Sequence, residues 1–282
     1  MQRGAAPAAD PTAEVNITMN FIRSRIYFAL VSTATIACAH AVFAATEVRE
    51  EFRQTYPLAK QGKVRLDNVN GDVRIVTWDR EEIKVEAIKR AKKQEHLDEI
   101  KIEVDAKADQ IRIKTKHPES KLRRNKDNSG SVEYLLTVPA QCRLDRINTV
   151  NGNVEIEKVG GDVEASSVNG SVTAAGLAAR VQLSTVNGSV KAAFAELKKS
   201  VSLKSVNGSV TVALPPEANA KISAHTLTGG IHSDFGLQTK KHFPIGQNLD
   251  GKLGEGGPAI DVSTVNGGIR IDRNKALALE SR

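Results

Sequence analysis

Two histidines and a carboxylate stand close together in the last third of the chain. His225, His232 and Asp234 are residue types that bind transition metals, so a metal site can be drawn from them. Histidines in such a loose arrangement are more often ordinary surface residues than metal ligands, and we interpret His225 and His232 in this way. We therefore predict no metal and no other cofactor.

Carboxylates gathered on one outward row would indicate the chemistry of a polysaccharide lyase, which holds a cation and activates a base. The row that follows the first valine of each repeated strand could do this work: Glu155, Thr173, Lys191, Thr211, His232 and Arg270. One carboxylate in six positions does not make such a site. A carbohydrate-active β-helical enzyme, similar to a polysaccharide lyase, is therefore kept as an alternative only.

Other catalytic and cofactor motifs are missing from the sequence. It contains no nucleophile elbow, no phosphate-binding loop and no His-Glu-x-x-His zinc helix. Residues 254–259 resemble a dinucleotide-binding fingerprint in their glycine spacing. That motif must lead into a helix, and here Pro258 and the lack of a following helical pattern argue against one. The sequence predicts a protein that is not an enzyme.

Residues 19–44 have the layout of a secretory signal peptide. A basic segment at 19–25 precedes an apolar run at 26–39, which is shorter than the roughly 20 residues that span a bilayer. Val42-Phe43-Ala44 fits a signal peptidase site, so we predict cleavage between Ala44 and Ala45. The mature protein is expected to be extracytoplasmic (periplasmic, on the cell surface or secreted) and not an integral membrane protein.

The chain has two cysteines. Cys38 offers lipoprotein anchoring as a minor alternative to cleavage. If Cys38 leaves with the signal peptide, Cys142 is the only thiol, and one thiol makes no internal disulfide. Aromatic residues are only 4% of the chain, so the core is expected to be narrow and filled by small aliphatic side chains.

The formal charge is +7, and basic residues concentrate in one apparent loop: Lys121, Arg123, Arg124 and Lys126. A solvated flank is the plain interpretation of this segment. The functional interpretation is that this loop contacts an anionic surface, such as lipid headgroups or acidic polysaccharide. Nucleic acid is not a predicted partner, because the basic segment lacks interleaved aromatic residues. A second alternative function is an envelope-stress accessory protein that docks a partner through this loop.

A motif of the form Ser/Thr-Val-Asn-Gly recurs through the second half of the chain, with steps of 18, 18 and 20 residues between the first four asparagines. A weaker copy ends at Thr228-Gly229, and an isolated early copy contains Asn70-Gly71. The five clear Asn-Gly pairs are predicted to form a structural ladder of turns: Asn151, Gly152, Asn169, Gly170, Asn187, Gly188, Asn207, Gly208, Asn266 and Gly267.

Two geometries fit this repeat. Asn-Gly tolerates positive φ and is a strong hairpin signal, which would give an antiparallel β-meander. A β-solenoid, in which each repeat is one coil of two strands, explains better why residue identities recur in register. In either case the apolar positions, such as Val150, Val154 and Ile156, are predicted to bury one face of a strand.

The residues before the repeat predict a β-rich cap. Strands are expected at 64–66, 73–76, 83–87 and 132–138, a helical turn at 94–99, and a hairpin around 106–109. Near the other end, residues 246–257 are expected to be a glycine-rich loop that interrupts the repeat. Exposed terminal coils leave self-association open.

Three passages resemble the bacterial putative adhesin family, an extracytoplasmic β-repeat domain of the LiaG-like type. They are residues 71–79 running into 85–91, the entry Val138-Pro139-Ala140, and the closing segment 260–272. The resemblance implies a right-handed β-helix-like fold and no catalytic residues. It also implies that the loss of asparagine at Thr228 makes that coil irregular.

The sequence thus divides into a non-native or disordered leader outside the fold (1–18), a signal peptide (19–44), a β-rich N-terminal part (45–145), the β-repeat region (146–272) and a C-terminal tail (273–282). The predicted function is that of an exported, non-catalytic adhesin or cell-envelope interaction module. Its expected partner is an envelope or surface macromolecule, which is a glycan, an anionic lipid or a protein.

Overall fold

The computed structural model describes residues 47–117, 130–241 and 245–274. These residues lie in a compact unit, 44–282, which consists of β-strands and one short described helix, α1 (Gln94–Glu99). The 21 strands among the described residues form two sheets, one of ten strands and one of eleven, so the prediction of an all-β fold is confirmed. Within the described ranges, no helix is both long and apolar enough to cross a membrane.

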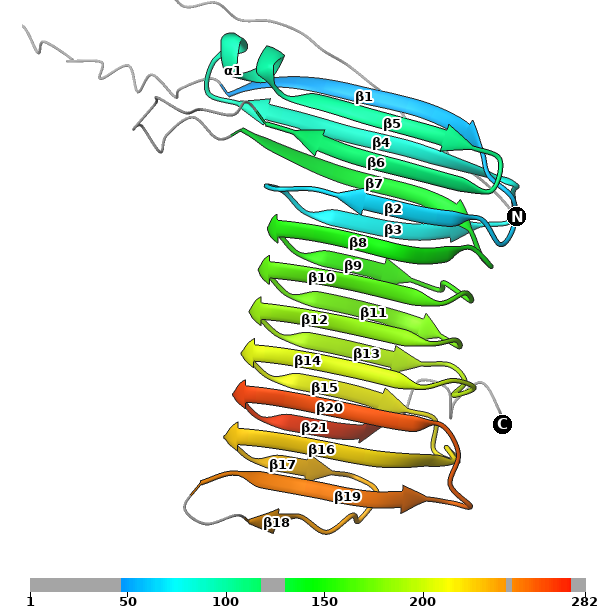
Figure 1. Ribbon diagram of the computed structural model, residues 1–282, viewed down its shortest axis with the longest axis vertical. Helices are drawn as coiled ribbons and strands as arrows, with labels where there is room; N and C mark the ends of the chain where they lie inside the picture. Colours follow the sequence, from blue (N-terminus) through cyan, green and yellow to red (C-terminus); the bar gives the residue numbers. More distant parts are fainter. Residues whose placement is uncertain (1–46, 118–129, 242–244, 275–282) are drawn as a thin grey trace, which may run out of the picture. The chain divides into compact units, whose positions relative to one another are not determined.

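The N-terminal part contributes seven strands, which flank and precede the repeat (Figure 1). They are β1 (Val48–Pro57), β2 (Lys63–Asp67), β3 (Val73–Trp78), β4 (Glu82–Ala91), β5 (Lys101–Lys107), β6 (Gln110–Lys116) and β7 (Ser131–Pro139). Strands β5 and β6 form the expected antiparallel hairpin, and α1 occupies the expected helical turn. The ten-residue strand β1, which pairs with β4 at the edge of its sheet, was not predicted.

The repeat region supplies the other strands. They are β8 (Arg143–Asn151), β9 (Val154–Glu157), β10 (Val163–Asn169), β11 (Val172–Leu177), β12 (Val181–Asn187), β13 (Val190–Phe194), β14 (Val201–Asn207), β15 (Val210–Leu214), β16 (Ala220–Thr228), β17 (Ile231–Ser233), β18 (Lys240–Lys241), β19 (Gln247–Leu253), β20 (Ala259–Asn266) and β21 (Ile269–Arg273).

Each repeat is one coil that places one strand in each sheet. Equivalent strands of successive coils pair in parallel and in register, as in Val163↔Val181 and Asn169↔Asn187 between β10 and β12. Turns between the two strands of a coil carry the chain from one sheet to the other (Figure 1). The β-solenoid prediction is therefore confirmed, and the antiparallel meander is wrong for the repeat region.

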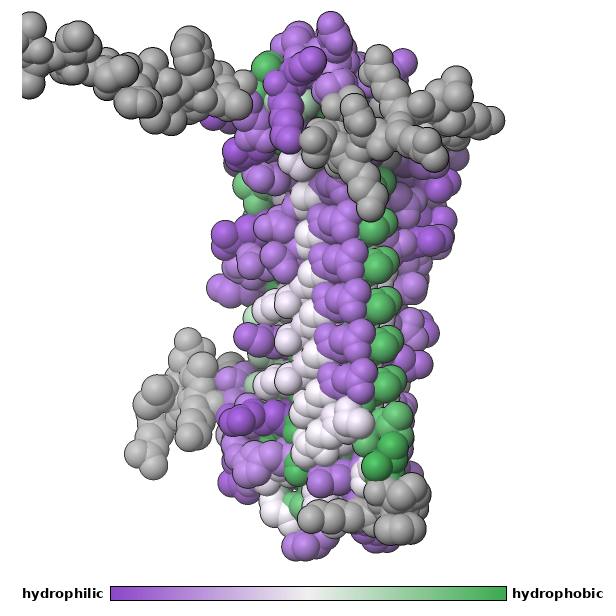
Figure 2. All heavy atoms as spheres, turned by 90° about the vertical axis from the view of Figure 1, so that its left-hand side faces the viewer, coloured by the Kyte–Doolittle hydropathy of each residue, from purple (hydrophilic) through white to green (hydrophobic). Residues whose placement is uncertain are grey.

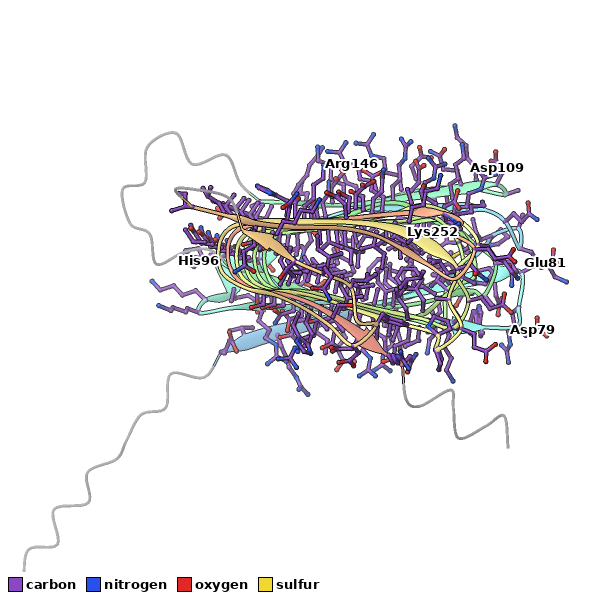
Figure 3. All side chains as sticks on the ribbon, turned by 90° about the horizontal axis from the view of Figure 1, so that it is seen from below. Asp79, Glu81, His96, Asp109, Arg146 and Lys252 are labelled. Carbon is purple, nitrogen blue, oxygen red and sulfur yellow. The ribbon has the colours of Figure 1, made fainter. Side chains whose placement is uncertain are left out.

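Small aliphatic side chains fill the space between the two sheets (Figure 3). Valine, isoleucine, leucine and alanine dominate the buried set, and Phe194 is its largest fully buried member. One assignment within this core was wrong. The first valine of each motif, such as Val150, is 38% exposed, whereas the preceding Thr149 is buried. Strand alternation explains this, because Thr149 and Val154 both face inward and the turn between them leaves Val150 outside.

The order of the coils in space departs from their order in the chain at both ends. At the cap end, β2 and β3 lie between β8 and β9 on one side and β6 and β7 on the other, although β6 and β7 come after them in the chain. At the other end, β20 lies between β14 and β16. The predicted loop at 246–257 is wrong in its first part, which is strand β19 and pairs antiparallel with β16.

Candidate interaction edge

An exposed column of aliphatic side chains runs along one edge of the solenoid, where the chain passes from one sheet to the other (Figure 2). Each member is between 38% and 40% exposed. We call this set the valine column: Val150, Val168, Val186, Val206, Leu227 and Val265. Since paired strands lie about 4.8 Å apart, the column repeats at that interval from coil to coil.

A ladder of exposed asparagine side chains runs beside the valine column (Figure 2). Each Nδ2 donates to the Oδ1 of the neighbouring rung, at 2.7 to 2.9 Å. In spatial order this asparagine ladder comprises Asn70, Asn151, Asn169, Asn187, Asn207 and Asn266. The structure thus brings together all five predicted asparagines and adds the early copy as their first rung.

Hydroxyl groups support the ladder from inside. In the five rungs after Asn70, the buried Ser or Thr two residues before the asparagine donates from its Oγ to a glycine carbonyl of the adjacent coil. Thr185 Oγ1 lies 2.7 Å from the carbonyl oxygen of Gly170, and Ser205 Oγ lies 2.9 Å from that of Gly188. These bonds satisfy buried polar groups and fix the separation of successive turns.

Close approach of the turns explains the glycines of the motif. A Cβ on Gly170 would collide with the carbonyl of Gly152, and a Cβ on Gly267 would collide with that of Gly208. Neither of these glycines has a φ in the left-handed region. At these two glycines, contact between coils is therefore the constraint, and positive φ is not.

Both ends of the asparagine ladder are closed by other groups. At the cap end, Asn70 Nδ2 donates to the carbonyl oxygen of Gly130 at 3.3 Å. At the other end, Thr228 Oγ1 lies 2.8 Å from Asn266 Oδ1 and takes the place of an asparagine. The coil that lacks asparagine is thus a regular terminal rung of the stack.

Together, the valine column and the asparagine ladder form what we call the interaction edge. Within the ladder each asparagine uses one N–H and one oxygen lone pair, and a carboxamide has a second of each. Because the asparagines other than the half-buried Asn70 are exposed, their spare groups face solvent next to an apolar stripe. The edge therefore offers repeated hydrogen bonding and apolar contact along a line, but no nucleophile and no acid or base.

Several predicted residues lie outside the described part of the chain. These are the cleavage pair Ala44 and Ala45, the alternative anchor Cys38, and the basic residues Lys121, Arg123, Arg124 and Lys126.

The histidines do not converge on a metal site. His225 belongs to β16 and His232 to β17, which are strands of different sheets. His232 Nε2 instead lies 3.3 Å from Asp234 Oδ1 on the surface. Across the described ranges, no group of three or more His, Cys, Asp or Glu side chains is arranged to hold a metal ion.

Carboxylates gather at a place that the sequence did not indicate. The predicted row from Glu155 to Arg270 does stack as one column, with a single carboxylate. A groove of about 440 Å³ beside Glu155 is also lined by Glu86 and Glu133, which come from β4 and β7. Glu86 pairs with Arg53 at 3.7 Å and Glu133 with Arg90 at 3.1 Å. Two carboxylates of the groove are thus paired with arginines of neighbouring strands.

Cys142 is fully buried, and burial raises the pKa of its thiol to about 12. A thiol with such a pKa is almost wholly protonated at neutral pH and is a poor nucleophile. Burial likewise raises the pKa of Tyr134 to about 12, although a hydrogen bond with Thr115 acts in the opposite direction. Both groups contribute to packing.

Comparisons with known proteins agree with this architecture. Residues 146–272 match the family model described as Toastrack DUF4097. A putative cell adhesion protein from Clostridium sporogenes is 16% identical, with a TM-score of 0.48, over 80% of this chain and 100% of that one. A putative adhesin from Bacteroides fragilis is 13% identical, with a TM-score of 0.40, over 80% and 97%. No curated protein matches significantly. The repeat region matches the Toastrack DUF4097 model, and the predicted resemblance to the β-repeat proteins of the putative adhesin family is confirmed.

Proposed function

We propose that the protein is an exported, non-catalytic, adhesin-like module of the cell envelope that binds an extended macromolecule along its interaction edge. The valine column is the observation that carries the proposal. Six coils each present an aliphatic side chain that is about 40% exposed, and they do so in one straight column. Contiguous apolar surface of this kind, bordered by polar groups, marks interaction sites.

The geometry favours a partner that is itself extended. Contacts at one rung are weak, but rungs that repeat at about 4.8 Å add their contributions when a partner spans several of them. The asparagine ladder supplies hydrogen-bonding groups at the same interval. A glycan strand or an extended protein surface meets both requirements.

Export and a second contact rest on the sequence. Residues 19–44 support passage through the secretory route, and the basic residues Lys121, Arg123, Arg124 and Lys126 support attraction to anionic lipid or polysaccharide. Replacing Arg123 and Arg124 by glutamate is expected to abolish the salt-sensitive part of binding. Unchanged binding at low salt would remove this contact from the proposal.

The test is a binding screen of the purified protein against envelope glycans, anionic liposomes and host matrix proteins, at low and physiological salt. For any ligand found, the triple variant Val168→Ser/Val186→Ser/Val206→Ser is expected to bind at least about tenfold more weakly, a loss of about 1.4 kcal/mol. The matched control is Ala175→Ser/Ala193→Ser/Ala213→Ser, which alters three successive positions on the outer face of one sheet.

Both triple variants are expected to keep the wild-type unfolding midpoint, because none of the six positions is buried. Equal affinity of the valine variant and the wild type for every ligand would contradict the role of the edge. Turnover of a glycan by the purified protein would contradict the non-catalytic part.

A further inference from the structure

The coil formed by β20 and β21 fills a place between two coils that precede it in the chain. Strand β20 pairs in parallel with β14 on one side and with β16 on the other, so Ile260 lies in register with both Val201 and Ile222. Strand β21 lies in the same way between β15 and β17. Figure 1 shows this red and orange coil inside the stack, above the yellow coil.

The inserted coil makes the contacts of an ordinary coil on both of its sides. Asn266 Nδ2 donates to Asn207 Oδ1 at 2.8 Å, and its own Oδ1 accepts from Thr228 Oγ1 at 2.8 Å. Thr264 Oγ1 donates to the carbonyl oxygen of Gly208, also at 2.8 Å. Four inward aliphatic side chains of this coil are buried: Ile260, Val262, Ile269 and Ile271.

A short glycine-rich segment, Gly254-Glu255-Gly256-Gly257-Pro258, joins the inserted coil to β19. Gly254 and Gly256 have φ values of 53° and 84°, which side chains other than glycine rarely adopt. The Glu255 backbone N–H donates to Asn219 Oδ1 at 2.8 Å. Such a segment has the composition of a hinge, because its turn depends on a few glycine conformations.

We propose that the gap between the β14–β15 coil and the β16–β17 coil is an acceptor site for a strand pair, and that a second copy of this chain occupies it. Two copies then exchange β20 and β21 and form a coil-swapped dimer. Every contact inside the gap is the same whichever copy supplies the coil, and only the hinge changes conformation. Exchange of an identical element is a low-cost route to dimers.

The partner copy contributes residues to the interaction edge in this dimer. Val265 and Asn266 belong to β20, so one rung of each valine column and each asparagine ladder comes from the other copy. A dimer would hold two such edges and bind a repetitive surface at two points. This consequence for binding rests on the proposed function, whereas the exchange itself does not.

The exchange is tested by mixing two variants that each carry one exposed cysteine, Lys204→Cys and Ser263→Cys, in a Cys38→Ser/Cys142→Ala background. These positions face each other in β14 and β20. Parallel neighbours of this kind are close enough for a disulfide. The mixture is unfolded, refolded together at high protein concentration and oxidised with glutathione disulfide, and dimers are measured by non-reducing electrophoresis.

The matched control mixes Ser184→Cys with Lys204→Cys, which face each other in β12 and β14, two coils that follow one another in the chain. We expect disulfide-linked dimers in the first mixture to exceed those in the control at least about fivefold. Equal amounts in the two mixtures would overturn the proposal. A second pair in the same strands, Ser202→Cys with Asp261→Cys, repeats the test if the first pair impairs folding.

The hinge gives an independent measurement. Gly254→Val places a β-branched residue at a φ of 53°, which disfavours the closed turn but not an extended hinge. The dimer fraction in size-exclusion chromatography is therefore expected to rise several-fold over the wild type after refolding at the same concentration. An unchanged or smaller dimer fraction would contradict the exchange. Neither readout involves ligand binding, so their failure is distinct from failure of the proposed function.

Discussion

The middle of the solenoid and its two ends are built by the same contacts but with different chain connections. Between Asn151 and Asn207, neighbouring rungs of the asparagine ladder are 18 or 20 residues apart in sequence. At the ends, Asn70 bonds to Asn151 across 81 residues and Asn207 to Asn266 across 59. The donor–acceptor distances at the ends, 2.7 and 2.8 Å, are close to the 2.8 to 2.9 Å found in the middle.

The sequence therefore specifies two separate things, the contacts between neighbouring coils and the order in which coils become neighbours. The motif specifies how one coil contacts the next, and a solenoid is stabilised mainly by such nearest-neighbour contacts. Which coil becomes the neighbour is decided by the connecting segments and by the caps. The two kinds of information are expected to respond differently to substitution.

The largest effect is expected at the close turns of the middle. Gly170→Ala places a Cβ against the carbonyl of Gly152, and the two coils must separate to accept it. We expect the free energy of unfolding to fall by about 1–3 kcal/mol, as for other overpacked sites. Urea unfolding followed by circular dichroism measures this change.

The matched control is Gly230→Ala in the terminal coil, where a Cβ would meet no atom within 4 Å. Its effect is expected to stay within about 0.5 kcal/mol of zero. Similar losses for both variants would show that backbone entropy, and not contact between coils, determines the glycine positions.

A smaller difference is expected within the asparagine ladder. Asn187→Ala removes two hydrogen bonds, one to Asn169 and one from Asn207. Thr228→Ala at the end removes a single hydroxyl donor, whose one proton is shared between Asn266 Oδ1 and the carbonyl oxygen of Val265. At about 0.5–1.5 kcal/mol per bond, Asn187→Ala is expected to lower the free energy of unfolding about twice as much. Equal losses in urea unfolding would indicate that the ladder does not act rung by rung.

The smallest effect concerns the opposite edge of the middle coils, where Asp162 links three of them. Its carboxylate accepts from Lys199 Nζ at 3.0 Å and from the Arg180 backbone N–H at 3.2 Å. Partial burial raises the pKa of Asp162, but these bonds and the two positive charges outweigh it and lower the pKa overall.

A lowered pKa in the folded state stabilises the protein above the unfolded value of about 3.9, and this contribution is lost as pH falls through the folded value. Asp162→Asn is therefore expected to lose less stability than the wild type between about pH 5 and pH 3, by about 1 kcal/mol or less because the partners are exposed. Thermal melts across this range measure the difference. A steeper loss in Asp162→Asn would contradict the assigned sign.

Much of the fold could be predicted from the sequence because the same residue types recur at equivalent positions of successive repeats. Stacking of Val181 on Val163, and of Asn187 on Asn169, was predictable from the step of 18 residues. The insertion of β20 was not, since Asn266 carries the same motif wherever it lies in the stack. Strand β19 was missed because its glycine and polar residues show no strand pattern, and its pairing with β16 and β18 is seen only in the fold.

One of the two components of the interaction edge, the asparagine ladder, could be predicted from the sequence, and the other, the valine column, could not. The Asn-Gly ladder was predicted, but Val150 and its equivalents were assigned to the core, because alternation alone does not tell which side of a turn a residue faces. The buried hydroxyl of Thr149 was the available signal. A Ser or Thr fixed at the same position in successive copies indicates an inward hydrogen bond, which turns the following valine outward.

The inserted position of β20 and β21 also has a mechanical consequence. A pulling force applied to the chain just after Arg273 reaches a coil that has parallel neighbours on both flanks. That coil detaches only when two sets of strand pairings are sheared at once, whereas a coil at the tip of a stack peels away from one. The fold therefore resists tension on this side of the chain more strongly than a solenoid whose last coil in sequence is also its last in space.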